Sequence, residues 1–236
     1  MNLVMKKFSR CGVLALLFFA VMSVAPEAAQ GAMPDKIFLE LCKKGTADEM
    51  RAALAAGIHV NARYGNGVTA LMWAAGNNPD PEVVKTLLEC GADVNVRTRA
   101  GRTALMYAAR ENANPEVAKA LLAGGADVHA RDNELGVTAL IWAAAKNSNP
   151  EVVKALLEGG ADVNARDNKN WGLTALMAAA GNNSNPEVVK MLLENGADAH
   201  AVDKDGDSAI WWAQKRKHGD KEKILQILKE YASSVR

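Results

Sequence analysis

Apolar residues recur along most of this chain in two short helical patterns that alternate with each other. Between Thr138 and Gly160, the residues Leu140, Ala143 and Ala144 follow the i, i+3, i+4 spacing of one helix face. A polar break follows, and then a second apolar face is formed by Val152, Val153, Leu156 and Leu157. The two patterns predict a pair of short helices that bury their apolar faces against each other.

Residues that favour the beginning and the end of a helix flank both patterns. Thr138 can cap the first helix, because its hydroxyl can accept a hydrogen bond from a backbone N–H that has no helical partner. Asn149 and Pro150 can begin the second helix, since proline at the first helical position loses no hydrogen bond. Gly160 can end it in a left-handed conformation. The turn-rich residues from Asp162 onward predict an extended connection, or finger, to the next pair.

This unit repeats in register. The first helix is preceded by Thr69, Thr103, Thr138, Thr174 and Ser208, and the second ends at Gly91, Gly125, Gly160 and Gly196. Each Thr lies 22 residues before its Gly, whereas the connection to the next unit varies from 12 to 14 residues. Variation confined to the connections is typical of packed units joined at the surface. The pattern predicts an all-α repeat solenoid of about six helix pairs, because such units stack side by side.

The repeated letters resemble ankyrin repeats over residues 35–236. The helix pair ends in G-A-D-V-N-A and the finger ends in G-x-T-A-L. The family usually reads T-P-L-H here, but this chain has Met106, Ile141 or Trp211 in the last place, so we expect an apolar contact instead of a polar one. One extra residue also lies between the helices. The resemblance implies a helix-turn-helix stack with hairpin-like fingers that binds a protein through its concave face.

Residues 1–31 do not follow the repeat. A basic start precedes an apolar run at residues 12–25, which is shorter than the roughly 20 residues that a membrane-spanning helix needs. A small-x-small site follows at Ala29-Gln30-Gly31. These features predict a signal peptide over 1–31 and hence a periplasmic or secreted protein. The alternative is a membrane anchor formed by residues 12–25.

The remaining residues, 32–236, form the predicted ankyrin repeat domain. Its predicted parts are a cap at 35–64, full repeats at 65–98, 99–132, 133–167 and 168–203, and a cap at 204–236. The whole chain has 28 Lys and Arg against 27 Asp and Glu. Without residues 1–31 these become 25 and 26, a net charge of −1. This balance does not indicate nucleic-acid binding.

Residues that could carry chemistry do not form a recognisable site. Cys42 and Cys90 occupy different positions of adjacent units, so we expect free thiols, although an exported protein could form a disulfide. His129 and His200 lie two units apart, too far to share a metal. A calcium-loop-like start at 203–207 lacks the glutamate required at its twelfth position. No serine, cysteine or threonine has a recurring His and Asp partner. We therefore predict no metal, no cofactor and no enzymatic activity.

One position of the first helix departs from the repeat by carrying large aromatic side chains. It reads Trp73, Tyr107, Trp142, Ala178 and Trp212. Arg110 and Lys146 follow three and four residues after an aromatic residue and so share its helix face. Tryptophan and tyrosine are enriched in binding hot spots, and the resemblance puts this face in the concave groove. The alternative is that the rings pack between repeats as core.

The fingers also differ from one unit to the next. Arg99, Leu135 and Trp171 are the candidate contacts there. Leu135 and Trp171 lie in the two fingers with inserted residues, where an apolar side chain has no evident role in folding. The alternative is that Trp171 folds back onto the neighbouring finger.

These observations predict an exported protein–protein interaction module, an adaptor or scaffold that acts as a monomer and binds one protein partner. No membrane contact beyond the signal segment is expected. The alternatives are a small-ligand or metal carrier and a structural element that assembles with itself.

Overall fold

The computed structural model describes residues 35–216 and 220–234; the predicted signal peptide and the alternative anchor lie outside these residues. The described part contains twelve helices in six pairs. In chain order they are α2 (Asp35–Lys44), α3 (Ala47–Ala55), α4 (Ala70–Asn77), α5 (Pro81–Glu89), α6 (Ala104–Glu111), α7 (Pro115–Ala123), α8 (Ala139–Lys146), α9 (Pro150–Glu158), α10 (Ala175–Asn182), α11 (Pro186–Glu194), α12 (Ala209–Lys215) and α13 (Lys221–Ser234). The predicted all-α repeat solenoid is confirmed.

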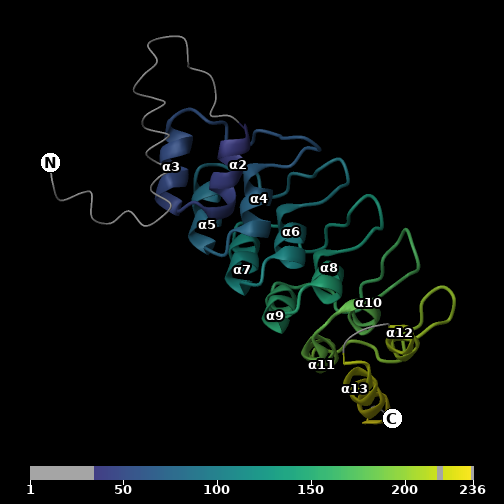
Figure 1. Ribbon diagram of the computed structural model, residues 1–236. Helices are drawn as coiled ribbons and strands as arrows, with labels where there is room; N and C mark the ends of the chain where they lie inside the picture. Colours follow the sequence, from purple (N-terminus) through teal and green to yellow (C-terminus); the bar gives the residue numbers. More distant parts are fainter. Residues whose placement is uncertain (1–34, 217–219, 235–236) are drawn as a thin grey trace, which may run out of the picture.

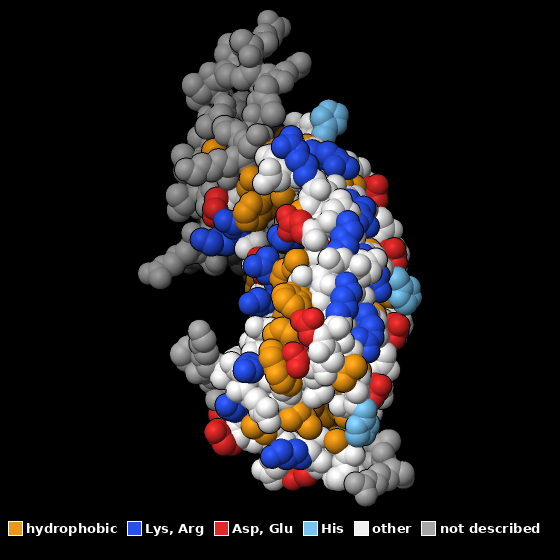
Figure 2. All heavy atoms as spheres, turned by 90° about the vertical axis from the view of Figure 1, so that its right-hand side faces the viewer, with side chains coloured by type: hydrophobic (Ala, Val, Ile, Leu, Met, Phe, Trp, Pro, Cys, Tyr) orange, Lys and Arg blue, Asp and Glu red, His pale blue; other side chains and the backbone are white. Residues whose placement is uncertain are grey.

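The helices stack in two layers, with the fingers projecting from one side (Figure 1). The even-numbered helices contact one another along the inner layer, next to the fingers, and the odd-numbered helices from α3 to α13 form the outer layer. The stack is bent, and one long side is hollowed (Figure 2). The helices of each pair therefore contact each other and the helices of the two neighbouring pairs, which is the organisation of a solenoid.

The predicted helix boundaries have the expected local causes. The Thr138 hydroxyl accepts a hydrogen bond from the Ile141 N–H at 3.4 Å, and the Asn149 side chain accepts one from the Glu151 N–H at 3.0 Å. Gly160 has a φ of 90°, a left-handed conformation that glycine adopts without steric cost. The other full repeats use the same devices, whereas Ser208 makes no side-chain cap bond.

The core consists of the same positions in successive repeats. Its fully buried large side chains include Leu71, Leu87, Leu105, Leu121, Leu140, Leu156 and Leu176. Met106 and Ile141, which stand where the family has histidine, are 2% and 4% exposed, so apolar side chains fill these places as expected. Trp211 is instead half-buried and meets Trp212 edge to face, with ring centroids 5.2 Å apart.

An asparagine ladder, formed by Asn78, Asn112, Asn147 and Asn183, ties each repeat to the preceding one. Asn147 Nδ2 donates to the backbone carbonyls of Ala109 and Asn112, at 3.0 and 2.8 Å, and its Oδ1 accepts from the Asn149 N–H at 3.0 Å. The other ladder residues also donate to two backbone carbonyls of the preceding repeat. In the last repeat Arg216 takes this role and donates to the carbonyls of Ala180 and Asn183. These buried bonds satisfy polar groups that would otherwise be costly to bury.

A second set of asparagines clasps the ends of the outer helices. Asn95 Nδ2 donates to the Gly125 carbonyl at 3.0 Å, and its Oδ1 accepts from the Asp127 N–H at 2.9 Å. Asn61 and Asn164 form the same two bonds with the next repeat. His129 occupies this position between Asn95 and Asn164, and its ring forms no such bond in the described chain. One junction therefore lacks a clasp.

Each finger is closed by a short antiparallel hydrogen bond, so the fingers are hairpin-like without forming extended strands in the described chain. We name the fingers by the residues that close them: 64–68, 98–102, 132–137, 167–173 and 203–207. Three backbone bonds join neighbouring fingers: Arg99 N–H to Asn66, Asn133 N–H to Ala100 and Lys204 N–H to Trp171. At the fourth junction, between fingers 132–137 and 167–173, Lys169 Nζ donates to the Asn133 carbonyl at 2.9 Å, so all neighbouring fingers are joined.

Cys42 and Cys90 are not joined by a disulfide in the described chain. Cys42 is buried in α2, and this burial raises the pKa of its thiol to about 12. Cys90 is exposed at the end of α5. Among the described residues, none of the helices has the length and apolar character needed to cross a membrane.

Candidate protein-binding surface

The four aromatic side chains predicted to line the groove stand at the fourth residue of an inner helix. We call them the aromatic column: Trp73, Tyr107, Trp142 and Trp212. All four are half-buried, whereas Ala178, at the same position of α10, is 3% exposed. The rings are therefore neither enclosed in the core nor fully free. Each can offer an exposed edge to a partner while the rest of the ring is held by the fold.

The buried side of each ring lies against the preceding repeat. The Lys43 ammonium lies 4.8 Å from the centre of the Trp73 ring. A Cβ atom placed on Gly76 would lie 3.5 Å from the Cβ atom of Tyr107 and 3.8 Å from its ring, and one placed on Gly181 would lie 3.4 Å from the Trp212 ring. These are ordinary van der Waals distances, so both aromatic side chains pack directly beside the preceding inner helix. Packing between repeats and partial exposure, the two alternatives raised by the sequence, thus occur together.

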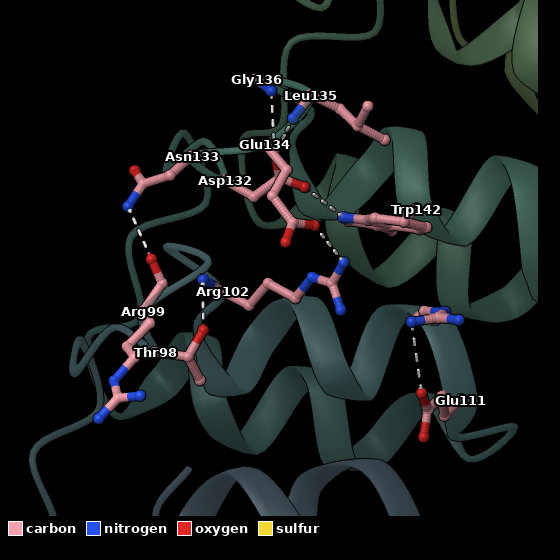
Figure 3. Close-up of polar contacts among 11 residues, drawn as sticks. Thr98, Arg99, Arg102, Glu111, Asp132, Asn133, Glu134, Leu135, Gly136 and Trp142 are labelled. Atoms are coloured by element: carbon pink, nitrogen blue, oxygen red, sulfur yellow. Dashed lines mark hydrogen bonds and ion pairs between the residues drawn. The ribbon is translucent and has the colours of Figure 1, made fainter. Parts of the chain in front are cut away.

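Trp142 has the most defined surroundings in the column (Figure 3). Its Nε1–H donates to Asp132 Oδ2 at 3.1 Å. The guanidinium of Arg110 lies 4.9 Å from the ring centre, and that of Arg102 lies at 5.4 Å while pairing with Glu134 at 2.8 Å. Cations at such distances are attracted to the ring face by about 0.5–1 kcal/mol at exposed sites. These contacts hold the ring in one orientation.

Asp132 connects the Trp142 ring to a finger tip. It is 2% exposed, and its Oδ1 accepts from the N–H groups of Leu135 and Gly136, at 2.8 and 3.0 Å (Figure 3). One carboxylate thus fixes both the indole and the turn of the finger. Asp203 does the same in the last repeat, where it accepts from Trp212 Nε1 at 2.9 Å and from two finger N–H groups.

The repeat that carries Ala178 in place of an aromatic ring also has a different hydrogen-bond pattern in its finger, 167–173. Asp167 has no indole to bind, and its Oδ2 accepts instead from the Leu173 N–H at 2.8 Å. Its Oδ1 accepts from the N–H groups of Asn170 and Gly172. The longer finger 167–173 therefore supplies the donor that an aromatic ring supplies elsewhere.

The two apolar finger residues predicted as contacts are exposed. Leu135 is 37% exposed and Trp171 is 47% exposed. The backbone carbonyl of Trp171 accepts from the Lys204 N–H at 2.9 Å, so the turn that carries this side chain is attached to the next finger. Exposed large apolar groups on an ordered turn are suited to contact with another macromolecule.

The predicted basic contacts fall in two places. Arg110 stacks on Trp142 and lies 3.8 Å from Glu111, so it belongs to the column. Lys146 is exposed at the end of α8 and has no ion-pair partner among the described residues. Arg99 is exposed on finger 98–102, and its carbonyl accepts from Asn133 Nδ2 at 3.4 Å (Figure 3).

Sequence reasoning missed a row of arginines at the base of the fingers, which we call the arginine ladder: Arg63, Arg97, Arg131 and Arg166. Arg63 Nη1 donates to the backbone carbonyl of Arg97 at 3.1 Å, and Arg97 Nη2 donates to that of Arg131. Arg131 and Arg166 continue the row by donating to the carbonyls of Arg166 and Val202, both at 2.5 Å. The equal spacing of these residues, 34, 34 and 35 apart, was the signal that could have revealed the ladder.

A metal centre and a pocket are the two other kinds of site to consider. Within the described residues, no cluster of three or more His, Cys, Asp or Glu side chains could hold a metal ion. A hollow of 520 Å³ lies at the ends of α3 and α5, lined by Arg51, Leu54, Ala55, Ile58, His59, Val60 and Cys90. It includes no residue of the aromatic column or the arginine ladder.

Comparison with known proteins gives one assignment. The family described as "Ankyrin repeats (3 copies)" matches residues 38–132, 71–167 and 140–235, which together span nearly all of the described chain. No curated protein matches the sequence. The family match agrees with the six stacked helix pairs, the fingers between them and the G-A-D segments that end the outer helices. This chain therefore belongs to the ankyrin-repeat family.

Proposed function

We propose that this protein is an exported interaction module that binds one protein partner through its aromatic column and its finger tips. Ankyrin repeats are in general protein–protein interaction modules. The observation that carries the proposal is that four repeats each present one half-buried aromatic ring, and that two of these rings, Trp142 and Trp212, donate hydrogen bonds to the buried carboxylates of Asp132 and Asp203. Rigid aromatic groups contribute much contact area and lose little entropy on binding.

Fixed orientation supports the role of Trp142 and Trp171 as the central contacts. The Trp142 indole is tied to Asp132, and the same carboxylate orders the turn that exposes Leu135. The turn that carries Trp171 is ordered by Asp167. A partner that contacts the column and the tips together would therefore meet a surface that is already in place.

Affinity capture from an exported-protein fraction tests this proposal. Trp142→Ala and Trp171→Ala should each reduce capture of a partner by about tenfold or more, which is the usual effect of removing a hot-spot residue. Ile37→Ala is a matched control, because Ile37 is 42% exposed and lies on α2, outside the proposed surface. Equal capture by all variants, each shown to be folded by circular dichroism, would refute the proposal.

Export and oligomeric state need separate measurements. We propose cleavage after the segment 1–31, so the mature chain recovered from the exported fraction should have the mass of residues 32–236. Recovery of the full-length chain with membranes would support the anchor at residues 12–25 instead. Light scattering should give the mass of a monomer, whereas larger, concentration-dependent masses would support self-assembly.

A further inference from the structure

The basic side chains of the two faces differ in whether they are neutralised. On the outer helices, lysines pair with glutamates of their own or the preceding outer helix: Lys85 with Glu82, Lys119 with Glu116, Lys154 with Glu151, Lys190 with Glu194 and Lys223 with Glu187. The arginine ladder is different. Within residues 35–216 and 220–234, no carboxylate lies within 4.0 Å of a ladder guanidinium. The ladder is thus a row of uncompensated positive charges.

Each ladder guanidinium also has donors left over. A guanidinium carries five N–H donors. Arg131 uses only Nη1, which donates to the carbonyls of Gly136 and Arg166. Arg166 likewise uses only Nη1, and Arg63 uses one terminal nitrogen for one carbonyl. Arg97 uses Nη2 alone, for the Arg131 carbonyl and Asn133 Oδ1. The second terminal nitrogen of each residue has no partner in the described chain.

The ladder is nevertheless held in place. Every guanidinium is clamped to a backbone carbonyl of the next repeat, while Arg63, Arg97 and Arg166 remain exposed and Arg131 half-buried. Figure 2 shows a row of Lys and Arg side chains along the upper part of the finger side, beside a row of hydrophobic side chains. Arginines that are already ordered lose little rotamer entropy when they bind a carboxylate, which their planar fork fits.

The two exposed apolar tips lie directly beside this row. Arg131 donates to the carbonyl of Gly136, the residue after Leu135, at 2.8 Å. Arg166 donates to the carbonyl of Gly172, the residue after Trp171, at 3.0 Å. The second half of the ladder therefore combines positive charge with apolar area. The fingers of the first half carry Gly65-Asn66-Gly67 and Ala100-Gly101 at their tips and offer no large apolar group.

We propose that the arginine ladder binds an extended acidic segment of the partner protein, with one carboxylate for each repeat. This inference rests on the proposed function and specifies its partner. Stacked helix layers are separated by about 8–10 Å. A polyproline II segment has about three residues per turn and rises about 3.1 Å per residue, so its side chains return to the same face every 9 Å or so. Carboxylates at every third residue would then meet successive ladder arginines.

The spacing of the ladder arginines favours a protein segment over a nucleic acid. A nucleic-acid strand carries a charge about every 3.4 Å in a duplex, roughly three for each layer of the stack. The ladder offers one guanidinium for each layer. Apolar side chains of the segment would contact Leu135 and Trp171 at the end of the ladder, where exposed apolar area is found. The segment would thus be acidic along its length and apolar at one end.

Peptide binding to the full chain tests the proposal without changing the protein. One probe is a fluorescent peptide of about twelve residues with glutamate at every third position, proline between, and a terminal leucine. The second probe has the same composition with its glutamates contiguous. We expect fluorescence anisotropy to show about tenfold tighter binding of the periodic peptide, because only this peptide matches the spacing of the ladder. A fluorescent oligothymidylate of similar length should bind more weakly than the periodic peptide.

A comparison of two double variants tests whether the periodic peptide binds at the arginine ladder. Arg97→Gln with Arg131→Gln should weaken binding of the periodic peptide by about tenfold. Lys119→Gln with Lys154→Gln removes the same charge from the outer helices and should change affinity by less than about twofold. Thermal unfolding followed by circular dichroism shows whether each variant is folded. If the ladder variant does not fold, the proposal is tested by the difference in affinity of the unaltered chain for the two peptides.

Each other outcome overturns the proposal. Equal affinity for the two peptides would mean diffuse charge attraction, tighter binding of the oligothymidylate would mean an anion surface of another kind, and no binding at millimolar concentration would mean that the ladder is structural. If these results occur while Trp142→Ala and Trp171→Ala still reduce partner capture, only the ladder proposal fails. If partner capture is also unaffected by those two variants, the proposed function fails with it.

Discussion

The junction at His129 offers the sharpest test of how this stack is stabilised. Asn61, Asn95 and Asn164 each form two hydrogen bonds with the next repeat, of 3.0 to 3.1 Å to a glycine carbonyl and of 2.8 to 2.9 Å from an aspartate N–H. His129 leaves the equivalent groups of Gly160 and Asp162 without this partner. Replacing His129 with Asn should restore both bonds.

The expected gain follows from the two bonds. Each net hydrogen bond contributes about 0.5–1.5 kcal/mol, and the exposed position favours the lower half of this range, so His129→Asn should raise the free energy of unfolding by about 1–2 kcal/mol. For a chain of this size, that change raises the Tm by about 4 °C. Thermal and urea unfolding followed by circular dichroism at pH 7.5 measure the effect.

Two control variants separate the clasp from a general preference for asparagine. His200→Asn changes the same position in the last G-A-D segment, which no further G-A-D segment follows among the described residues, and should leave the Tm unchanged. Asn95→His should remove a clasp and lower the Tm by a similar amount. An unchanged or lower Tm for His129→Asn, or an equal rise for His200→Asn, would refute the reasoning.

Three further predictions concern buried groups. Asn147→Ala removes two buried hydrogen bonds and one partly buried one, and should lower the free energy of unfolding by about 3 kcal/mol in urea titrations; an unchanged free energy would mean that apolar packing alone stabilises the junction. Trp142→Phe keeps the ring but leaves Asp132 Oδ2 without its indole donor, so stability should fall by about 1 kcal/mol; no loss would mean that water replaces the bond fully. Iodoacetamide followed by peptide mass spectrometry should modify Cys90 rapidly and Cys42 only on unfolding. Because the folded Cys42 keeps its proton above the ordinary thiol pKa of 9.0, stability should also fall as pH rises from 9.0 toward about 12, and Cys42→Ser should remove this slope.

The parts of the fold that depend on local sequence could be predicted. Thr138, Asn149 and Gly160 act through hydrogen bonds and backbone angles within a few residues of themselves, so their roles follow from the letters alone. The alternation of apolar faces likewise determines which residues are buried. The number of helix pairs followed from counting these signals along the chain.

Features that join different repeats were harder to predict. The position of Asn147 in a loop suggested only a polar break, yet its side chain is 5% exposed and bonds to carbonyls 35 and 38 residues earlier. The arginine ladder likewise depends on contacts between residues 34 to 36 apart. For Trp142, the sequence predicted which helix face carries the ring but could not show that Asp132, ten residues earlier, binds its indole.

The asparagine ladder has a consequence for how such a protein can change length. Each of its side chains reaches only the adjoining unit, so the bonds at one boundary are complete without reference to the units farther away. Insertion or deletion of a whole unit therefore reconstitutes the same ties at the new boundary. Gene duplication can extend or shorten such an array one unit at a time, with no compensating substitutions elsewhere.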